Sequence, residues 1–131
     1  MSEPEHGGEL TERDFDEPAL LIKLSDVDDE TLRNKYRLYE RTRGEWAASL
    51  ERVRGIRLAL AVVGGRVVEA YRVAGWFRSA ETMHVDPDFS PALGRVEFVG
   101  NLASQDLRDR YRGRTAHDLF SGRNPIRYIK S

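Results

Sequence analysis

The chain has 131 residues, of which 40% are hydrophobic and 33% are charged, and its formal net charge is −1. This length and composition indicate one soluble globular domain and exclude a fibre or a membrane protein, whose spans need about 20 consecutive apolar residues. There is no cysteine, which excludes disulfides, thiolate nucleophiles and cysteine-based metal sites. The acidic N-terminus lacks the apolar stretch of a signal peptide, so we expect a cytoplasmic protein.

Charge is distributed unevenly along the chain. Residues 1–30 carry eleven acidic and two basic side chains, whereas residues 31–131 carry nineteen basic and eleven acidic ones. Residues 1–18 have too little apolar content to offset the entropy of ordering, so we predict a disordered acidic tail there and a single α+β domain over residues 19–131. The tail either keeps the protein in solution or folds over the basic body and competes with an anionic ligand.

The first elements of the domain are a strand and a helix. Residues 19–24 form an apolar run that predicts a buried strand, and Ser25 with the acidic residues 26–30 favours a helix start. Apolar side chains then recur at helical spacing, which predicts one long helix or a helix broken at Gly44. They are Leu32, Tyr36, Tyr39, Trp46, Leu50 and Val53. Arg43 falls on the same apolar face, where its charge either reaches water over packed methylenes or meets a ligand.

A β-hairpin and a long loop come next. Residues 58–63 and 66–73 are strand-like runs on either side of Gly64-Gly65, a pair whose backbone readily turns a hairpin. Residues 80–94 contain prolines, aspartates and a glycine. We expect a long loop there, of the kind that is often functional.

The last part of the chain predicts a strand, a short helix and a final strand. Residues 95–99 alternate in polarity, so we expect Glu97 on the outer face of a strand. Residues 102–112 predict a short helix capped by Ser104. Residues 126–129 predict the last strand.

The combination of arginines with aromatic rings is typical of nucleic-acid binding, because guanidinium groups contact phosphates and bases stack on rings. Eighteen of the 21 basic residues are arginine, a bias that a GC-rich genome would also produce. We expect Trp46 and Trp76 to form stacking surfaces or pocket walls, the arginines to contact phosphate, and Asn124 to hydrogen-bond a base edge. The expected nucleic-acid-binding residues are Arg41, Arg43, Trp46, Trp76, Phe77, Arg78, Arg112, Arg114 and Asn124. The alternative for Trp76 is that it fills the open end of a small barrel.

Catalytic and metal-binding patterns are weak in this sequence. His6, His84 and His117 lack the mutual spacing of metal ligands, and there is no glycine-rich phosphate loop. We therefore expect no metal, no cofactor and no catalytic residue, and the leading function is binding of nucleic acid, DNA or RNA. One alternative is a protein-interaction or regulatory module that docks through the acidic tail. Another is a small metal-dependent hydrolase or nuclease that uses Glu97 with His84 or Asp86.

The predicted order of elements resembles the PUA-like superfamily, which includes the ASCH and EVE groups. A bacterial family of small stand-alone proteins is similar in three segments, which are residues 95–100, 107–114 and 124–129. The resemblance implies a mixed β pseudo-barrel that holds nucleic acid, in some members with a flipped or modified base in an aromatic pocket. It would place that pocket between the helix with Arg43 and Trp46 and the strand that ends at Trp76. The glycine–lysine–glutamate signature of the ASCH group is absent from this sequence.

Overall fold

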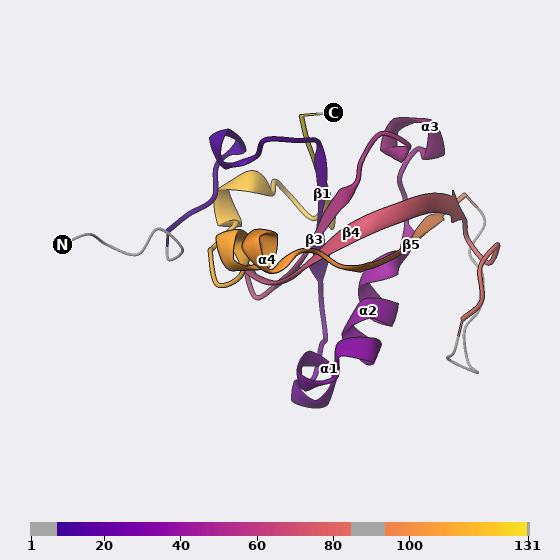
Figure 1. Cartoon of the computed structure of the whole chain (residues 1–131), viewed down its shortest axis with the longest axis horizontal. Helices are drawn as coiled ribbons and strands as arrows, with labels where there is room; N and C mark the ends of the chain where they lie inside the picture. Colours follow the sequence, from indigo (N-terminus) through magenta and orange to yellow (C-terminus); the bar gives the residue numbers. More distant parts are fainter. Residues whose placement is uncertain (1–7, 85–93, 131) are drawn as a thin grey trace.

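A six-stranded sheet that curls into half a barrel is the centre of the fold (Figure 1). The structure is a computed structural model and describes residues 8–84 and 94–130. The strands in chain order are β1 (Ala19–Leu24), β2 (Gly44–Trp46), β3 (Leu58–Val63), β4 (Arg66–Arg78), β5 (Val96–Leu102) and β6 (Ile126–Ile129). Across the sheet the order is β2-β5-β4-β3-β1-β6, with β1 parallel to β3 and the other pairs antiparallel. The expected α+β class is confirmed, and no helix of the described residues is long and apolar enough to cross a membrane.

The predicted hairpin joins β3 to β4. Its turn residues, Gly64 and Gly65, have φ angles of 59° and 79°, in the left-handed region that glycine adopts without strain. β3 is apolar throughout because both faces of this central strand are buried. β4 is longer than the predicted run over residues 66–73 and includes Trp76 and Phe77 at its end.

Short helices follow β1, where we expected one long helix or a helix broken at Gly44, and one of them ends directly before this glycine. They are α1 (Asp29–Arg33), α2 (Lys35–Arg43) and α3 (Leu50–Val53). Asn34 separates the first two, because its side-chain oxygen accepts hydrogen bonds from the backbone N–H groups of Tyr36 and Arg37 and so begins α2. Gly44 begins β2, where a Cβ atom would lie 2.9 Å from the Cβ of Glu97 on β5. A glycine is therefore required at this close approach of the two strands.

One more helix and two 3-10 turns complete the described elements. The helix is α4 (Gln105–Tyr111), and the turns are η1 (Glu12–Asp14) and η2 (His117–Leu119). Ser104 caps α4, since its hydroxyl accepts a hydrogen bond from the Leu107 N–H over 3.3 Å. This cap is the one that the sequence predicts.

Two apolar cores lie on the two faces of the sheet, as alternate residues of β1 show. Leu21 packs in a core with Leu10 and Tyr111, whereas Leu20 packs in a core that contains Trp76 and Phe98. Side chains on successive residues of a strand point to opposite faces. Both faces of the central strands are therefore covered.

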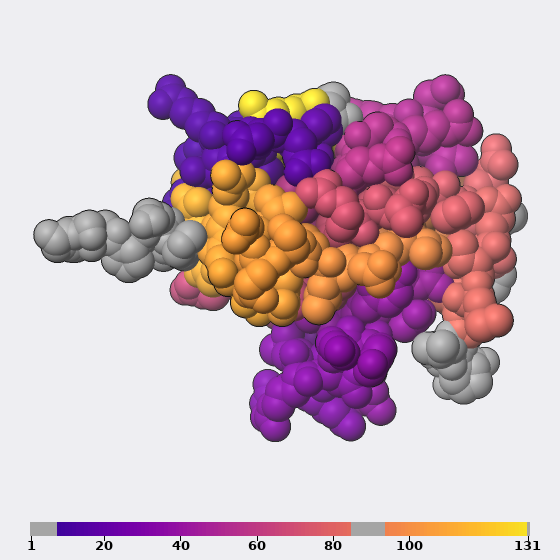
Figure 2. Space-filling view, viewed as in Figure 1, coloured from indigo at the N-terminus to yellow at the C-terminus, as the bar shows by residue number. Residues whose placement is uncertain are grey.

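Residues 8–18 differ from the expectation of a disordered tail. Leu10 and Phe15 are buried, and Phe15 stacks on Tyr111 with ring centroids 4.9 Å apart. Figure 2 shows this N-terminal segment, in indigo, packed against the orange and yellow residues of the C-terminal part. Burial of these two large apolar side chains stabilises the ordered segment, although its average composition is polar. Residues 1–7 lie outside the described residues.

Candidate functional site

A buried carboxylate, that of Glu97, is the centre of a polar cluster at the start of β5. Its relative exposure is 0%. Oε1 accepts a hydrogen bond from the Ala80 N–H over 3.0 Å and lies 2.8 Å from Nε2 of His84. Oε2 accepts from the Thr82 N–H over 2.9 Å and also from the Thr82 hydroxyl. Nη1 of Arg43 lies 3.9 Å from Oε2, so the cluster also contains a buried ion pair.

The guanidinium group of Arg43 joins α2 to this cluster and is only 2% exposed. Nη1 donates to the Thr82 hydroxyl over 2.8 Å and to the Phe98 carbonyl over 3.2 Å, while Nη2 donates to the Met83 carbonyl. Nε donates to a carboxylate oxygen of Glu40 over 3.3 Å. The expectation that Arg43 reaches water is wrong, and because its donors are engaged with acceptors of the chain itself, these contacts give no support to the expected phosphate contact.

Glu97 is ionised in this environment. Burial by itself would raise the pKa of its carboxyl group, but hydrogen bonds from the Thr82 hydroxyl, the Ala80 N–H, His84 and the Thr82 N–H outweigh burial and hold the pKa below its ordinary value. The expectation of an outward, exposed Glu97 is wrong. The side chain of Glu97 does point to the opposite face of the sheet from those of Val96 and Phe98, because side chains alternate along a strand. Residues 80–84 cover that face and so bury the carboxylate.

The cluster brings together two residues of the hydrolase hypothesis, Glu97 and His84, whereas Asp86 lies outside the described residues. Both oxygens of Glu97 accept from residues 80–84. Within residues 8–84 and 94–130, no three histidine, aspartate or glutamate side chains are placed to hold a metal ion. The cluster has the geometry of a clamp that fixes the end of β4 against β5 and α2.

The two tryptophans make structural contacts. Trp76 is 8% exposed, packs edge-on against Phe98 with ring centroids 5.2 Å apart, and donates its indole N–H to the Ile56 carbonyl over 2.9 Å. Trp46 is half-buried, and its indole N–H donates to the Thr42 carbonyl over 2.7 Å. Trp76 therefore packs as a core residue, which agrees with the alternative that it fills the interior and gives no support to an open stacking surface.

The nine residues expected to bind nucleic acid do not form one surface. Trp46 on β2 and Arg78 on β4 both pair with Val96, so the strand β5 lies between them, and Phe77, which is exposed, precedes Arg78 on β4 and points to the opposite face of the sheet. Arg41 of α2 donates to the Ser25 carbonyl over 2.8 Å. Three of the nine lie elsewhere, after α4 or before β6, and these are Arg112, Arg114 and Asn124.

An acidic strap, which we define as residues 9–17, neutralises several arginines of the basic body. Four of its carboxylates form ion pairs with arginines from distant parts of the chain. The pairs are Glu12–Arg127, Asp14–Arg114 at 3.3 Å, Asp16–Arg110 at 2.9 Å and Glu17–Arg72 at 2.8 Å. Hydrogen bonds from the Thr115 hydroxyl and the Asp118 N–H lower the pKa of Glu9. Arg114 is thus paired within the chain and is not open to phosphate in the way that we expected.

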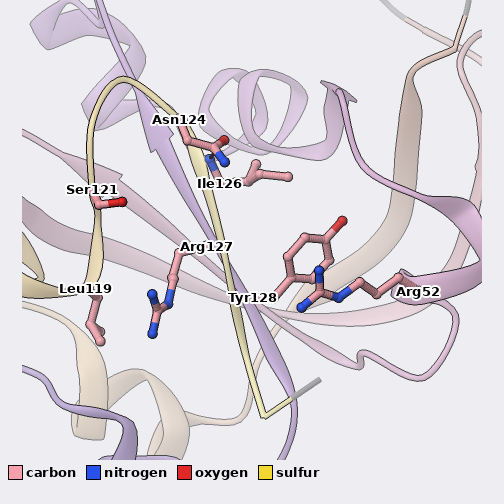
Figure 3. A pocket seen from close by; sticks show the side chains of 7 residues that line it. All are labelled: Arg52, Leu119, Ser121, Asn124, Ile126, Arg127 and Tyr128. Carbon is pink, nitrogen blue, oxygen red and sulfur yellow. Dashed lines mark hydrogen bonds between the residues drawn. The ribbon is translucent and has the colours of Figure 1, made fainter.

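A cavity of about 340 Å³ lies along β6, which is an edge strand of the sheet (Figure 3). Its polar lining comes from Arg52, Ser121, Asn124, Arg127 and Tyr128. The guanidinium group of Arg52 lies over the ring of Tyr128, 3.6 Å from the ring centroid. In Figure 3 these two side chains lie on one side of β6 and Arg127 lies on the other, so residues from both sides of this edge strand line the cavity.

Two polar groups at this cavity retain hydrogen-bonding capacity. Nη2 of Arg127 contacts Glu12, but Nε of Arg127 is buried and has no partner in the part of the chain that the structure describes. Oδ1 of Asn124 accepts from the Ile126 N–H over 3.1 Å. Its amide nitrogen makes no hydrogen bond to the described residues, so it can donate to a ligand.

A second cavity, of about 390 Å³, lies between β4, β5 and the start of α4. Its lining is more apolar and includes Val73, Leu102 and Leu107. The charged residue in its wall, Arg72, is already held by both carboxylate oxygens of Glu17 at 2.8 and 3.1 Å. This second cavity therefore offers a ligand less charge than the cavity along β6.

Sequence reasoning found one residue of the β6 cavity, Asn124, and missed its charged and aromatic walls. Arg127 and Tyr128 follow Asn124 closely, and an Arg-Tyr pair on a short final strand is a signal that could have been used. Arg52 carried no such signal, because only the fold brings α3 next to β6.

Comparison of the chain with protein-family models, with curated proteins and with solved structures found no match. The candidate site therefore rests on its own geometry.

Proposed function

We propose that this protein binds single-stranded nucleic acid in the cavity along β6, and that its curled sheet is a PUA-like pseudo-barrel. One observation carries the proposal. A single cavity combines the stacked pair of Arg52 and Tyr128 with the guanidinium group of Arg127 and the amide of Asn124. Guanidinium groups suit phosphate, planar side chains suit bases, and an amide suits a base edge.

The size of the cavity supports an unpaired nucleotide as the bound unit. Its volume of about 340 Å³ is at the lower end of the range found for small-molecule sites. A duplex would present its phosphates to such a cavity but could not insert a base without unpairing it. A single strand can place one base beside the guanidinium plane of Arg52 and a neighbouring phosphate near Arg127.

The charge of the described chain also supports a polyanionic ligand. Residues 8–84 and 94–130 contain all 21 basic residues and 18 acidic ones. The acidic strap pairs with four of the arginines. The surplus is modest, so we expect binding that is salt-dependent but relies on the cavity for most of its affinity.

Fluorescence anisotropy with labelled single-stranded and duplex DNA and RNA, at low and physiological salt, tests this proposal. Arg52→Ala should weaken single-strand binding by about 5- to 150-fold, the equivalent of about 1–3 kcal/mol for one stacked base. The matched control is Arg54→Ala, because Arg54 is an exposed arginine at the end of the same helix and outside the cavity. Thermal melts establish that both variants are folded.

The two variants separate cavity binding from general attraction to a polyanion. A much larger loss for Arg52→Ala than for Arg54→Ala supports the cavity. Equal small losses would mean that only the net charge of the surface matters. Absence of binding by the wild-type protein to every probe at low salt would refute the proposal.

A further inference from the structure

The geometry of Arg127 shows an incomplete contact at the rim of the β6 cavity. Nε and Nη2 form the side of a guanidinium group that grips two oxygens of one anion, as Arg108 grips the two oxygens of Glu69 at 2.8 and 3.0 Å. In Arg127, Nη2 contacts Glu12 while Nε is buried without a partner among the described residues. Buried N–H groups are rarely left unpaired, and such a group needs an explanation.

Glu12 is held near Arg127 by the packing of the acidic strap. It belongs to η1, and the anchors of the strap, Leu10 and Phe15, lie on either side of it in the sequence and are buried. The side chains of the pair itself are partly open to solvent, at 51% for Glu12 and 38% for Arg127. Exposed ion pairs contribute little to stability, so the Glu12 carboxylate can swing away while the backbone of the strap stays in place.

We propose that Arg127 is the phosphate subsite of the cavity and that Glu12 is its internal competitor. This inference rests on the proposed function. It adds the residue that holds the phosphate and the residue that competes with the phosphate for it. In the free protein the Glu12 carboxylate accepts a hydrogen bond from Nη2 of Arg127. In the complex the Glu12 carboxylate swings away and uncovers this side of the guanidinium group, so one phosphate oxygen takes its place at Nη2 and a second phosphate oxygen satisfies Nε. The exchange requires no covalent step and no movement of Leu10 or Phe15.

The test compares Glu12→Gln with Asp16→Asn in the full-length protein. Each variant removes one negative charge from the strap and weakens one ion pair, but Arg110, the partner of Asp16, does not line the cavity. Glu12→Gln should tighten binding of a single-stranded oligonucleotide by about fivefold, the factor expected for loss of a competing exposed ion pair. Asp16→Asn should change affinity by less than about twofold through its charge alone.

A double-variant cycle with Arg127→Ala completes the experiment. The substitution Arg127→Ala should weaken binding and remove the gain from Glu12→Gln, because Glu12 then has no partner to release. If wild-type protein binds the oligonucleotide but Glu12→Gln and Asp16→Asn behave alike, the inference is overturned while the proposed function stands. A gain from Glu12→Gln that persists without Arg127 would also overturn it.

Two smaller probes separate this inference from the proposed function. A mononucleotide and inorganic phosphate are titrated against the wild-type protein and Glu12→Gln by calorimetry. A fivefold gain for the oligonucleotide and the mononucleotide, with weaker binding of inorganic phosphate, supports both proposals. Equal affinity for all three probes, with the Glu12→Gln gain retained, would support the subsite and overturn nucleic acid as its ligand.

Discussion

Replacement of Glu97 by glutamine should lower the free energy of unfolding by about 3–5 kcal/mol, the range for breaking a buried ion pair on one side. The carboxylate accepts from two backbone N–H groups, from the Thr82 hydroxyl and from His84, and it faces the guanidinium group of Arg43. An amide has one oxygen, so its NH₂ group would point at these donors. Among the described residues, Arg43 would keep Glu40 as its carboxylate partner. Urea unfolding followed by circular dichroism measures the loss.

The matched control for this substitution is Glu81→Gln. Glu81 lies in the same segment, but its Oε1 accepts one hydrogen bond, from the exposed Arg78 N–H, which an amide oxygen can also accept. We expect a change within about 0.5 kcal/mol there. A similar, small effect for both variants would show that the Glu97 cluster is not the clamp that we describe.

Acid should weaken the fold through the same carboxylate. The pKa of Glu97 is lower in the folded protein than its ordinary value, and that of Glu9 is lowered by its hydrogen bonds to Thr115 and Asp118. Groups with a lowered pKa contribute stability above their unfolded pKa, and they lose it as the pH falls through the folded pKa. The free energy of unfolding should therefore decrease below about pH 5. The decrease should be smaller in Glu97→Gln, and an unchanged slope would contradict the assignment.

Local patterns predicted much of the fold. The Gly64-Gly65 hairpin, the apolar strand over residues 19–24 and the Ser104 cap each depend on neighbours a few residues apart, and each is present in the structure. The single long helix was wrong for a local reason as well, since Asn34 offers a second cap inside the periodic pattern, whereas the alternative break at Gly44 coincides with the end of α2 at Arg43. The predicted apolar face is also incomplete, because Tyr36 is 71% exposed.

Contacts between distant residues could not be predicted in this way. Arg43 stood out as a charge on an apolar face, but nothing in the sequence linked it to Glu97 on another element. The stacked pair of Arg52 and Tyr128 depends on the packing of α3 beside β6. Asn124 was predicted because turn chemistry and base recognition both favour an amide there. Asn124 was therefore the one residue of the β6 cavity that the sequence predicted, because its local turn pattern also falls within the cavity.

The acidic strap is the feature for which composition was most misleading, and Phe15→Ala tests it. The Phe15 ring is 1% exposed and stacks on Tyr111 at an interplanar angle of 19°. Its removal should lower the free energy of unfolding by about 3–5 kcal/mol, as for other buried aromatic residues. Phe77→Ala is the control, because Phe77 is 37% exposed and should cost less than about 1 kcal/mol.

The same pair of variants also decides what the strap does to binding. If Phe15 anchors the strap, its loss loosens four carboxylates from the arginines that they neutralise, so salt-dependent affinity for a single strand should rise in Phe15→Ala at temperatures where the domain remains folded. Phe77 does not line the β6 cavity, so Phe77→Ala should leave binding in that cavity unchanged, and a loss in this variant would instead favour the set of binding residues expected from the sequence. Equal stability of the two variants would instead mean that Phe15 does not anchor residues 9–17. In that case the strap would compete with a polyanion along its whole length, and the effect of Glu12 would not be confined to Arg127.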